Sequence, residues 1–166
     1  IRLNRKPGEE IYGMDRLIAF VTNPYLLTGL SSWAYAQIIK TIIFLIIHKK
    51  LDLSRMFGDG GMPSGHSATV VSLATLIGLT QGFGTVTFAL SMIFAIVVCH
   101  DATGVRRETE KQAFIIDELV KAFEELRDEK LPEVKLKKFV GHSPFQVAAG
   151  VGLGIANAFL MYFLMF

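Results

Sequence analysis

Four long windows of this chain are almost devoid of charged residues, and this pattern restricts the possible folds more than any other feature. The windows cover residues 25–48, 64–82, 85–100 and 145–166, and Lys40 is the one full charge within them. An apolar helix of about 20 residues spans the hydrocarbon core of a bilayer. With 51% hydrophobic and 19% charged residues, the chain is also more apolar than a typical soluble domain. We therefore expect an all-α integral membrane protein with about four transmembrane helices.

Residues 108–130 differ in character from the four windows. Apolar side chains recur there at helical spacing and charged residues fill the positions between them. The apolar positions are Ala113, Ile116, Leu119, Val120, Phe123 and Leu126. Lys121 and Glu125 stand four residues apart, which favours an ion pair on a helix. We expect an amphipathic helix outside the bilayer core.

The first residues of the chain are charged and show neither the apolar core nor the cleavage pattern of a signal peptide. Because Met14 resembles a natural start, we interpret residues 1–13 as an N-terminal extension or cloning remnant. Residues 14–166 then form a single membrane-embedded domain. Within it, a short apolar patch at residues 17–21 precedes Asn23-Pro24, a pair that predicts a helix break.

Charge and cysteine usage exclude several classes of protein. The net charge of +2, with no basic arm interleaved with aromatic residues, predicts no nucleic-acid partner. The single cysteine, Cys99, cannot form an internal disulfide and lies in an apolar window, where a buried role is expected. No cluster of His, Cys and Asp has a metal-binding spacing, so we expect neither a metal ion nor another cofactor.

The order of the four windows predicts which loops share a side of the membrane. Three reversals place residues 49–63 and 101–143 on one side and residues 80–84 on the other. The connection 80–84 carries no Lys or Arg, so the positive-inside rule assigns the charged side to the cytoplasm. The basic residues before Met14 point the other way, and we set them aside with the extension. Most of the chemically interesting side chains then collect at the cytoplasmic face.

The stretch Gly60–Ser67 carries the most distinctive local pattern. Its glycines allow tight or left-handed turns, and Pro63 suits the first turn of a helix. Ser64 or Ser67 can cap that helix, whose first N–H groups then point outward beside His66. Backbone amides, a hydroxyl and an imidazole together suit a phosphate group. The alternative is an ordinary glycine-rich turn before a capped helix.

Lys40 is the most unusual residue of the first window. A lysine within a span costs on the order of 3 kcal/mol on insertion scales. It lies about nine residues, roughly 13 Å at helical rise, from the basic end of the window. One interpretation is a lysine that snorkels to the interface. We favour a cation that faces a polar cavity.

The charged face also contains Asp101, Arg106, Arg107 and His142. Lysine and arginine neutralise the oxygens of a phosphoryl group. One histidine can attack phosphorus while a second protonates the leaving oxygen. Taken alone, the arginine pair is better explained as a positive-inside anchor and His142 as a residue at a helix start. The combination points to phosphoryl chemistry.

Several segments of the chain together resemble a known family. Pro63-Ser64-Gly65-His66 is similar to the central motif of the type 2 phosphatidic acid phosphatases, which share a superfamily with vanadium haloperoxidases. The stretch from about 33 to 157 resembles their divergent membrane branch more closely. The segments that carry the resemblance are Ala36-Gln37-x-x-Lys40, Gly60–Ala68, Asp101-Ala102-x-Gly104-Val105-Arg106-Arg107 and Gly141-His142-Ser143-Pro144.

The resemblance implies a metal-independent phosphomonoesterase or pyrophosphatase that acts through a phosphohistidine. By the same resemblance, His142 would be the nucleophile and His66 the acid. The residues that would bind phosphate oxygens are Lys40, Ser64, the Gly65 amide and Arg106 or Arg107.

The chain departs from the family pattern in three places. The third motif normally has its arginine and histidine close together, whereas the amphipathic segment 108–130 lies between Arg107 and His142 here. Ile47 and His48 stand where the first motif has Arg-Pro, and Lys49, Lys50 or Arg55 would have to compensate. Gln146 stands where an acid four residues after the histidine is expected, and an amide stabilises an imidazolium less than a carboxylate does. Asp101 is the candidate to replace that acid.

The leading hypothesis is a phosphatase acting on a membrane lipid phosphate or pyrophosphate monoester, in a bacterial cell membrane with its site on the cytoplasmic side. The departures keep two alternatives open: an inactive protein that binds phosphate or phospholipid headgroups, and a scaffold that uses residues 108–130 as a partner surface. Because the family core has six helices, we also expect that a homodimer completes the bundle.

Overall fold

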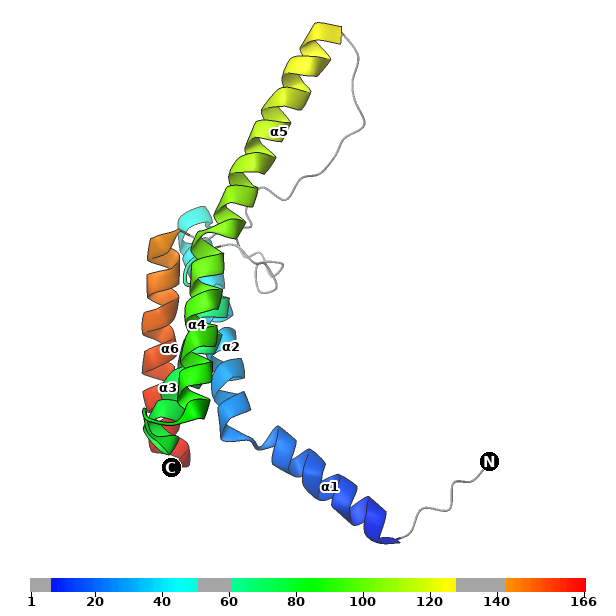
Figure 1. Cartoon of the computed structure of the whole chain (residues 1–166). Helices are drawn as coiled ribbons and strands as arrows, with labels where there is room; N and C mark the ends of the chain where they lie inside the picture. Colours follow the sequence, from blue (N-terminus) through cyan, green and yellow to red (C-terminus); the bar gives the residue numbers. More distant parts are fainter. Residues whose placement is uncertain (1–6, 51–60, 128–142) are drawn as a thin grey trace, which may run out of the picture.

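The computed structural model describes residues 7–50, 61–127 and 143–166. Every regular element in these ranges is a helix, which confirms the all-α prediction (Figure 1). The six helices are α1 (Pro7–Val21), α2 (Pro24–His48), α3 (Gly65–Gln81), α4 (Val86–Thr103), α5 (Val105–Arg127) and α6 (Pro144–Met165).

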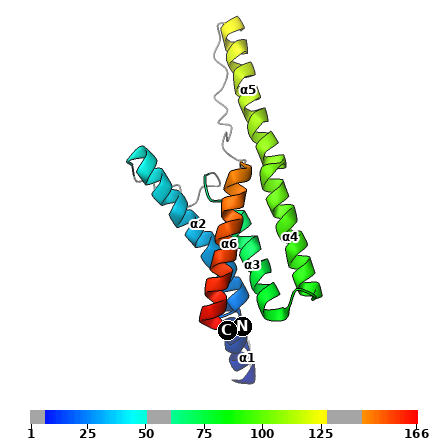
Figure 2. The ribbon, with the colours of Figure 1, turned by 90° about the vertical axis from the view of Figure 1, so that its left-hand side faces the viewer.

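Four of these helices form a bundle with α3 at its centre (Figure 2). Helix α3 packs against α2, α4 and α6, whereas α2 and α4 do not pack against one another within the described residues. By length and hydropathy, three helices of the described chain qualify as membrane spans, namely α2, α4 and α6. Helix α3 has 17 residues, the lower end of the usual spanning range of about 17–25. The four predicted windows thus correspond to three long apolar helices around a shorter central one.

Small residues allow α3 and α6 to approach closely. A Cβ added at Gly154 would lie 2.6 Å from the Ala68 carbonyl oxygen, and one added at Gly150 would lie 2.5 Å from the Ser64 carbonyl oxygen. The buried face of α3 is itself made mainly of alanine, serine and glycine, with Leu76 as its one large fully buried side chain. Van der Waals contact between close backbones is the main source of helix association in lipid.

The helix directions place the predicted site residues at one end of the bundle. Helices α2 and α4 end there, and α3 and α6 begin there (Figure 1). The turn at Gly82–Thr85 and the C-terminus lie at the opposite end. A hydrogen bond of 2.9 Å from the Ser64 N–H to the Gln146 carbonyl ties the start of α3 to the start of α6.

Helix α5 continues from α4 beyond the bundle, with a break at Gly104 (Figure 1). Helix α4 itself runs to Thr103, so the predicted end of the third window near residue 100 was three residues short. The amphipathic helix predicted for residues 108–130 is present as α5. Lys121 pairs with Asp117 at 3.0 Å. The side chain of Glu125, its predicted partner, lies outside the described part of the chain. The hydrogen bond to Asp117 raises the pKa of Lys121 above its ordinary value.

Residues 7–13, which we interpreted as part of an extension or cloning remnant, form the first part of α1. Pro7 is the first helical residue, a position that proline favours because its missing N–H has no helical partner. The predicted break at Asn23-Pro24 is present. The Asn23 side chain caps α2 by accepting hydrogen bonds from the N–H groups of Tyr25 and Leu26.

Candidate functional site

The loop Gly61–Ser64 leads directly into α3. Gly61 has a φ of +98°, a conformation that side-chain-bearing residues rarely adopt. Pro63 is buried and precedes the helix cap, whereas the sequence suggested that it would lie in the first helical turn. The peptide bond before it is cis. The N-cap is Ser64, one of the two predicted candidates.

Ser64 is fully buried and its hydroxyl is part of the cap. The Oγ atom accepts hydrogen bonds from the Ser67 N–H at 3.3 Å and from the Ser67 hydroxyl at 3.0 Å. A hydroxyl that accepts two hydrogen bonds still has its own proton to donate. The N–H groups of Gly65 and His66, the first two residues of α3, belong to the positive end of the helix dipole.

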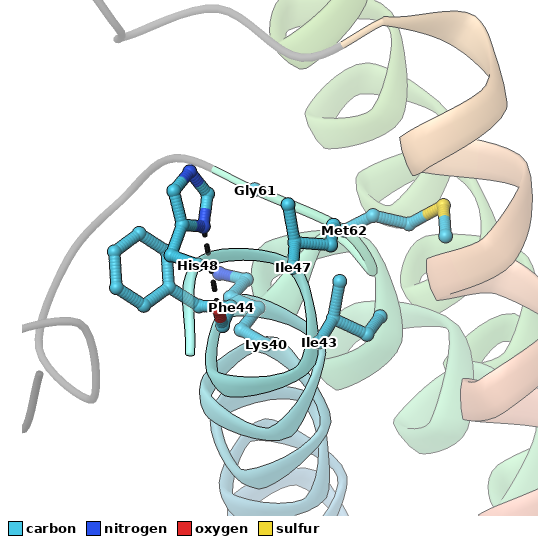
Figure 3. Close-up of a pocket in the computed structure, with 7 residues that line it drawn as sticks. All are labelled: Lys40, Ile43, Phe44, Ile47, His48, Gly61 and Met62. Carbon is cyan, nitrogen blue, oxygen red and sulfur yellow. Dashed lines mark hydrogen bonds between the residues drawn. The ribbon is translucent and has the colours of Figure 1, made fainter. Parts of the chain in front are cut away.

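Lys40 is 7% exposed and lies against the same loop. A Cβ added at Gly61 would lie 3.7 Å from Lys40 Cγ, and one added at Gly65 would lie 3.8 Å from Lys40 Nζ. The ammonium group therefore sits beside the first residue of α3. Figure 3 shows Lys40 in a pocket of about 110 Å³ whose other lining residues are Ile43, Phe44, Ile47, His48, Gly61 and Met62.

His66 is exposed and faces the gap between α2 and α4. It lies at one wall of an apolar groove of about 470 Å³, together with Trp33 of α2 and Val98 of α4. A Cβ added at Gly65 would lie 3.4 Å from Trp33 Cδ1, so the groove residue Trp33 and the Lys40 ammonium both lie beside Gly65.

The structure brings together Lys40, Ser64, Gly65 and His66, and it adds the start of α6 through Ser64 and Gln146. Asp101 is half-buried near the end of α4 and lines neither of the two pockets.

Two further predictions concern side chains that are not described. Arg106 and Arg107 occupy the first turn of α5, but their side chains lie outside the described part of the chain. His142 lies outside the described residues altogether. Within the described ranges, no group of three or more His, Cys, Asp or Glu side chains is arranged to hold a metal ion.

Gln146 has a role that we did not foresee. Its Oε1 accepts a hydrogen bond from the Ser143 N–H at 2.9 Å, and the Ser143 hydroxyl accepts one from the Gln146 N–H at 3.3 Å. This reciprocal pair is a capping box for α6. The spacing Ser143-x-x-Gln146 was visible in the sequence as a cap, and we had considered Gln146 only as a substitute for a carboxylate.

A cluster of buried polar groups near the middle of the bundle was also missed. The Asn157 Nδ2 of α6 lies 2.7 Å from Ser32 Oγ, 3.0 Å from Ser31 Oγ and 3.0 Å from the Thr28 carbonyl oxygen, all on α2. Ser72 of α3 donates to the same Thr28 carbonyl at 3.4 Å. These contacts join three helices whose polar residues are widely separated in the sequence.

Comparison with known proteins identifies the family of this chain. A family model described as "Divergent PAP2 family" matches residues 21–157, which include α2, α3, α4 and most of α6. The uncharacterized membrane protein YuiD of Bacillus subtilis (strain 168) is 42% identical over 155 residues, covering 87% of this chain and 98% of the relative. No solved structure matches the chain. This membrane protein therefore belongs to the divergent PAP2 family.

Proposed function

We propose that this protein is a membrane phosphatase that hydrolyses a lipid phosphate or pyrophosphate monoester through a phosphohistidine. The observation that carries the proposal is the position of the Lys40 ammonium beside Gly65, at the start of α3. Membership of the divergent PAP2 family supports the reaction class.

Two positive features meet at this point of the bundle. Lys40 carries a full charge, and the start of α3 carries the partial positive charge of the helix dipole. Each favours a negative charge, and each acts more strongly in surroundings of low dielectric constant. A phosphate monoester has two negative charges and several acceptor oxygens. It satisfies an ammonium and a helix N-terminus together, which a neutral lipid cannot do.

In the proposed reaction an imidazole nitrogen of His142 attacks phosphorus, and the bond between phosphorus and the lipid oxygen breaks. His66 gives its proton to that oxygen as it leaves. Water then attacks the phosphohistidine, His142 leaves, and the proton of the water passes to His66. Lys40, Ser64, the Gly65 amide, Arg106 and Arg107 stabilise the charge on the phosphoryl oxygens, and Asp101 supports an imidazolium.

The proposed location is a bacterial cell membrane with the site on the cytoplasmic side. Lys49 and Lys50 follow α2 at the site end, whereas the turn Gly82–Thr85 at the opposite end carries no Lys or Arg. A homodimer remains our expectation for completing the bundle, and chemical cross-linking in membranes tests it.

One observation favours a binding role over catalysis as the second candidate. The Gln146 oxygen is engaged in the α6 cap, where the related phosphatases are expected to have a carboxylate. Without that carboxylate an imidazolium near this position is less stabilised. A protein that binds phosphomonoester lipids without hydrolysing them would need Lys40 and the α3 terminus and would not need the acid.

The test is phosphate release from a lipid phosphate and from an aryl phosphate by purified protein, with and without a chelator, combined with acid-quench trapping. We expect release that is unaffected by the chelator. His142→Ala should abolish it for both substrates. His66→Ala should mainly slow the lipid phosphate, because an aryl oxide needs little protonation to leave. If the protein binds the lipid phosphate but neither releases phosphate nor traps a phosphohistidine, the phosphatase proposal is wrong and the binding role takes its place.

Lys40→Met provides the matched test of the anion site. Loss of one charge-assisted hydrogen bond of about 1.5–3 kcal/mol corresponds to about 10- to 150-fold weaker phosphate or vanadate binding. Lys50→Met removes the same charge from an exposed residue beyond the end of α2 and should change little. Equal phosphate affinities in the two variants would show that Lys40 only snorkels to the interface and does not bind the anion.

A further inference from the structure

The apolar groove beside His66 exists because α2 and α4 flank α3 without meeting. Both helices pack against α3, and within the described residues they do not pack against each other. One face of α3 is therefore open towards the bilayer between them. The groove has a volume of about 470 Å³, and the residues used below are Leu30 and Trp33 of α2, His66 and Thr69 of α3, and Phe94 and Val98 of α4.

The groove is apolar except at the end nearest the anion site. On α3 it extends from His66 to Val70, about 6 Å at helical rise. Phe94 and Val98 cover a similar length of α4. It is thus long enough for the first several carbons of a lipid chain and short compared with the whole span.

The groove and the anion site are neighbours at Gly65. A Cβ added there would lie 3.4 Å from Cδ1 of Trp33, which lines the groove, and 3.8 Å from Lys40 Nζ. A molecule with an anionic group at Lys40 would therefore place its neighbouring atoms against His66 and Trp33. Only an amphiphile, with phosphate at one end and hydrocarbon directly attached, matches both surfaces.

We propose that this groove holds the hydrocarbon segment next to the phosphate of a phosphomonoester lipid, which enters sideways from the bilayer between α2 and α4. The inference rests on the anion site of the proposed function and does not require hydrolysis.

Lipid specificity at such a groove cannot come from the hydrophobic effect. Lipid tails are as apolar as the groove, so moving a chain from one to the other yields little free energy. The preference for one lipid must come from the anchored headgroup and from the fit of the attached segment. A neutral lipid with the same chain should visit the groove only as often as bulk lipid does.

The experiment is photo-crosslinking in lipid nanodiscs. The probe is hexadecyl phosphate with a diazirine on one of its first carbons, and the control probe is the corresponding alcohol. We expect the phosphate probe to label the α2 and α4 segments lining the groove at least fivefold more than the alcohol. Lys40→Met should remove that excess.

A pair of neighbouring residues on α4 provides the matched variants. Val98→Trp places a large side chain in the groove and should lower the labelling by the phosphate probe at least fivefold. Val97 is 58% exposed and does not line the groove, so Val97→Trp should leave labelling unchanged. Leu30→Trp fills the groove from the opposite wall, at a position that is already 62% exposed. It replaces Val98→Trp in the experiment if that variant does not fold.

Each outcome separates this inference from the proposed reaction, because phosphate release is measured on the same samples. Equal labelling by the two probes, or labelling that both tryptophan variants at 30 and 98 leave intact, would overturn the groove as the lipid site. Groove labelling without phosphate release would support this inference and contradict the phosphatase. Phosphate release without groove labelling would support the phosphatase and contradict the groove as the lipid site.

Discussion

Gly150 offers the sharpest test of how the bundle positions the site. An alanine Cβ at this position would lie 2.5 Å from the Ser64 carbonyl oxygen and 3.1 Å from Ser67 Cβ. A carbon–oxygen contact normally needs about 3.3 Å or more. Gly150→Ala therefore requires a displacement of roughly 0.8 Å, and the nearest obstacle is backbone that cannot rotate away.

Gly150→Ala should reduce turnover more than it reduces the stability of the fold. Overpacking costs about 1–3 kcal/mol, and the better helix propensity of alanine offsets about 1 kcal/mol of this. A net destabilisation of about 0–2 kcal/mol leaves most of the protein folded. The displaced atoms belong to the N-cap of α3, and a misplacement of about 1 Å at a reacting centre can reduce turnover about 100-fold. We expect phosphate release to fall 10- to 100-fold.

Gly152→Ala is the control for this prediction. It introduces the same methyl group on the same helix, but among the described residues no atom outside the adjoining turns of α6 lies within 4 Å of the added Cβ. It should keep wild-type turnover and gain slightly in thermal stability. The measurements are phosphate release and thermal unfolding in detergent. Wild-type turnover in Gly150→Ala, or equal losses in the two variants, would show that the α3–α6 contact does not position the site.

Three further predictions test other parts of the structure. Asn157→Leu removes the polar contacts with α2 and should lower thermal stability by about 0.5–2 kcal/mol in detergent; an unchanged melting temperature would show that the cluster is not a clamp. In a cysteine-free background, Lys50→Cys and Glu108→Cys should react with an impermeant thiol reagent from one side of the membrane and Gln81→Cys from the other; opposite-side reaction of the first two would contradict the helix order. Gln146→Glu preserves the capping box and places a carboxylate where the related phosphatases are expected to have one, so turnover should rise; an unchanged or lower turnover would show that the missing acid does not limit the reaction.

The helices were predictable because their signals are local. Uncharged windows and the amphipathic pattern of residues 108–130 each describe one segment, and each gave a helix whose limits differ from the prediction by only a few residues. Helix α4 continues past the third window through Asp101 because nothing before Gly104 interrupts it. Helix α1 has no counterpart among the predicted windows.

The site was only partly predictable. Alternation of spans was enough to expect Lys40 near the Gly60–Ser67 motif, since both lie towards the same face. The capping role of Gln146 competes with a catalytic role at the same position, and the sequence contains no signal that decides between them. The groove depends on α2 and α4 remaining apart, which is a property of tertiary packing.

The packing of the bundle explains why the candidate site lies at its end. Buried α3 residues are mostly small, and Gly150 and Gly154 bring α6 into backbone contact with α3. Helices this close leave little room between them for a ligand the size of a phosphate, and the polar groups there, such as Asn157, are used to join helices. Room opens where α3 begins, because the turn at Gly61 leads the chain past Lys40, and along the side where α2 and α4 diverge. Under our proposals, the anionic headgroup therefore binds at the start of α3 and its hydrocarbon chain in the groove.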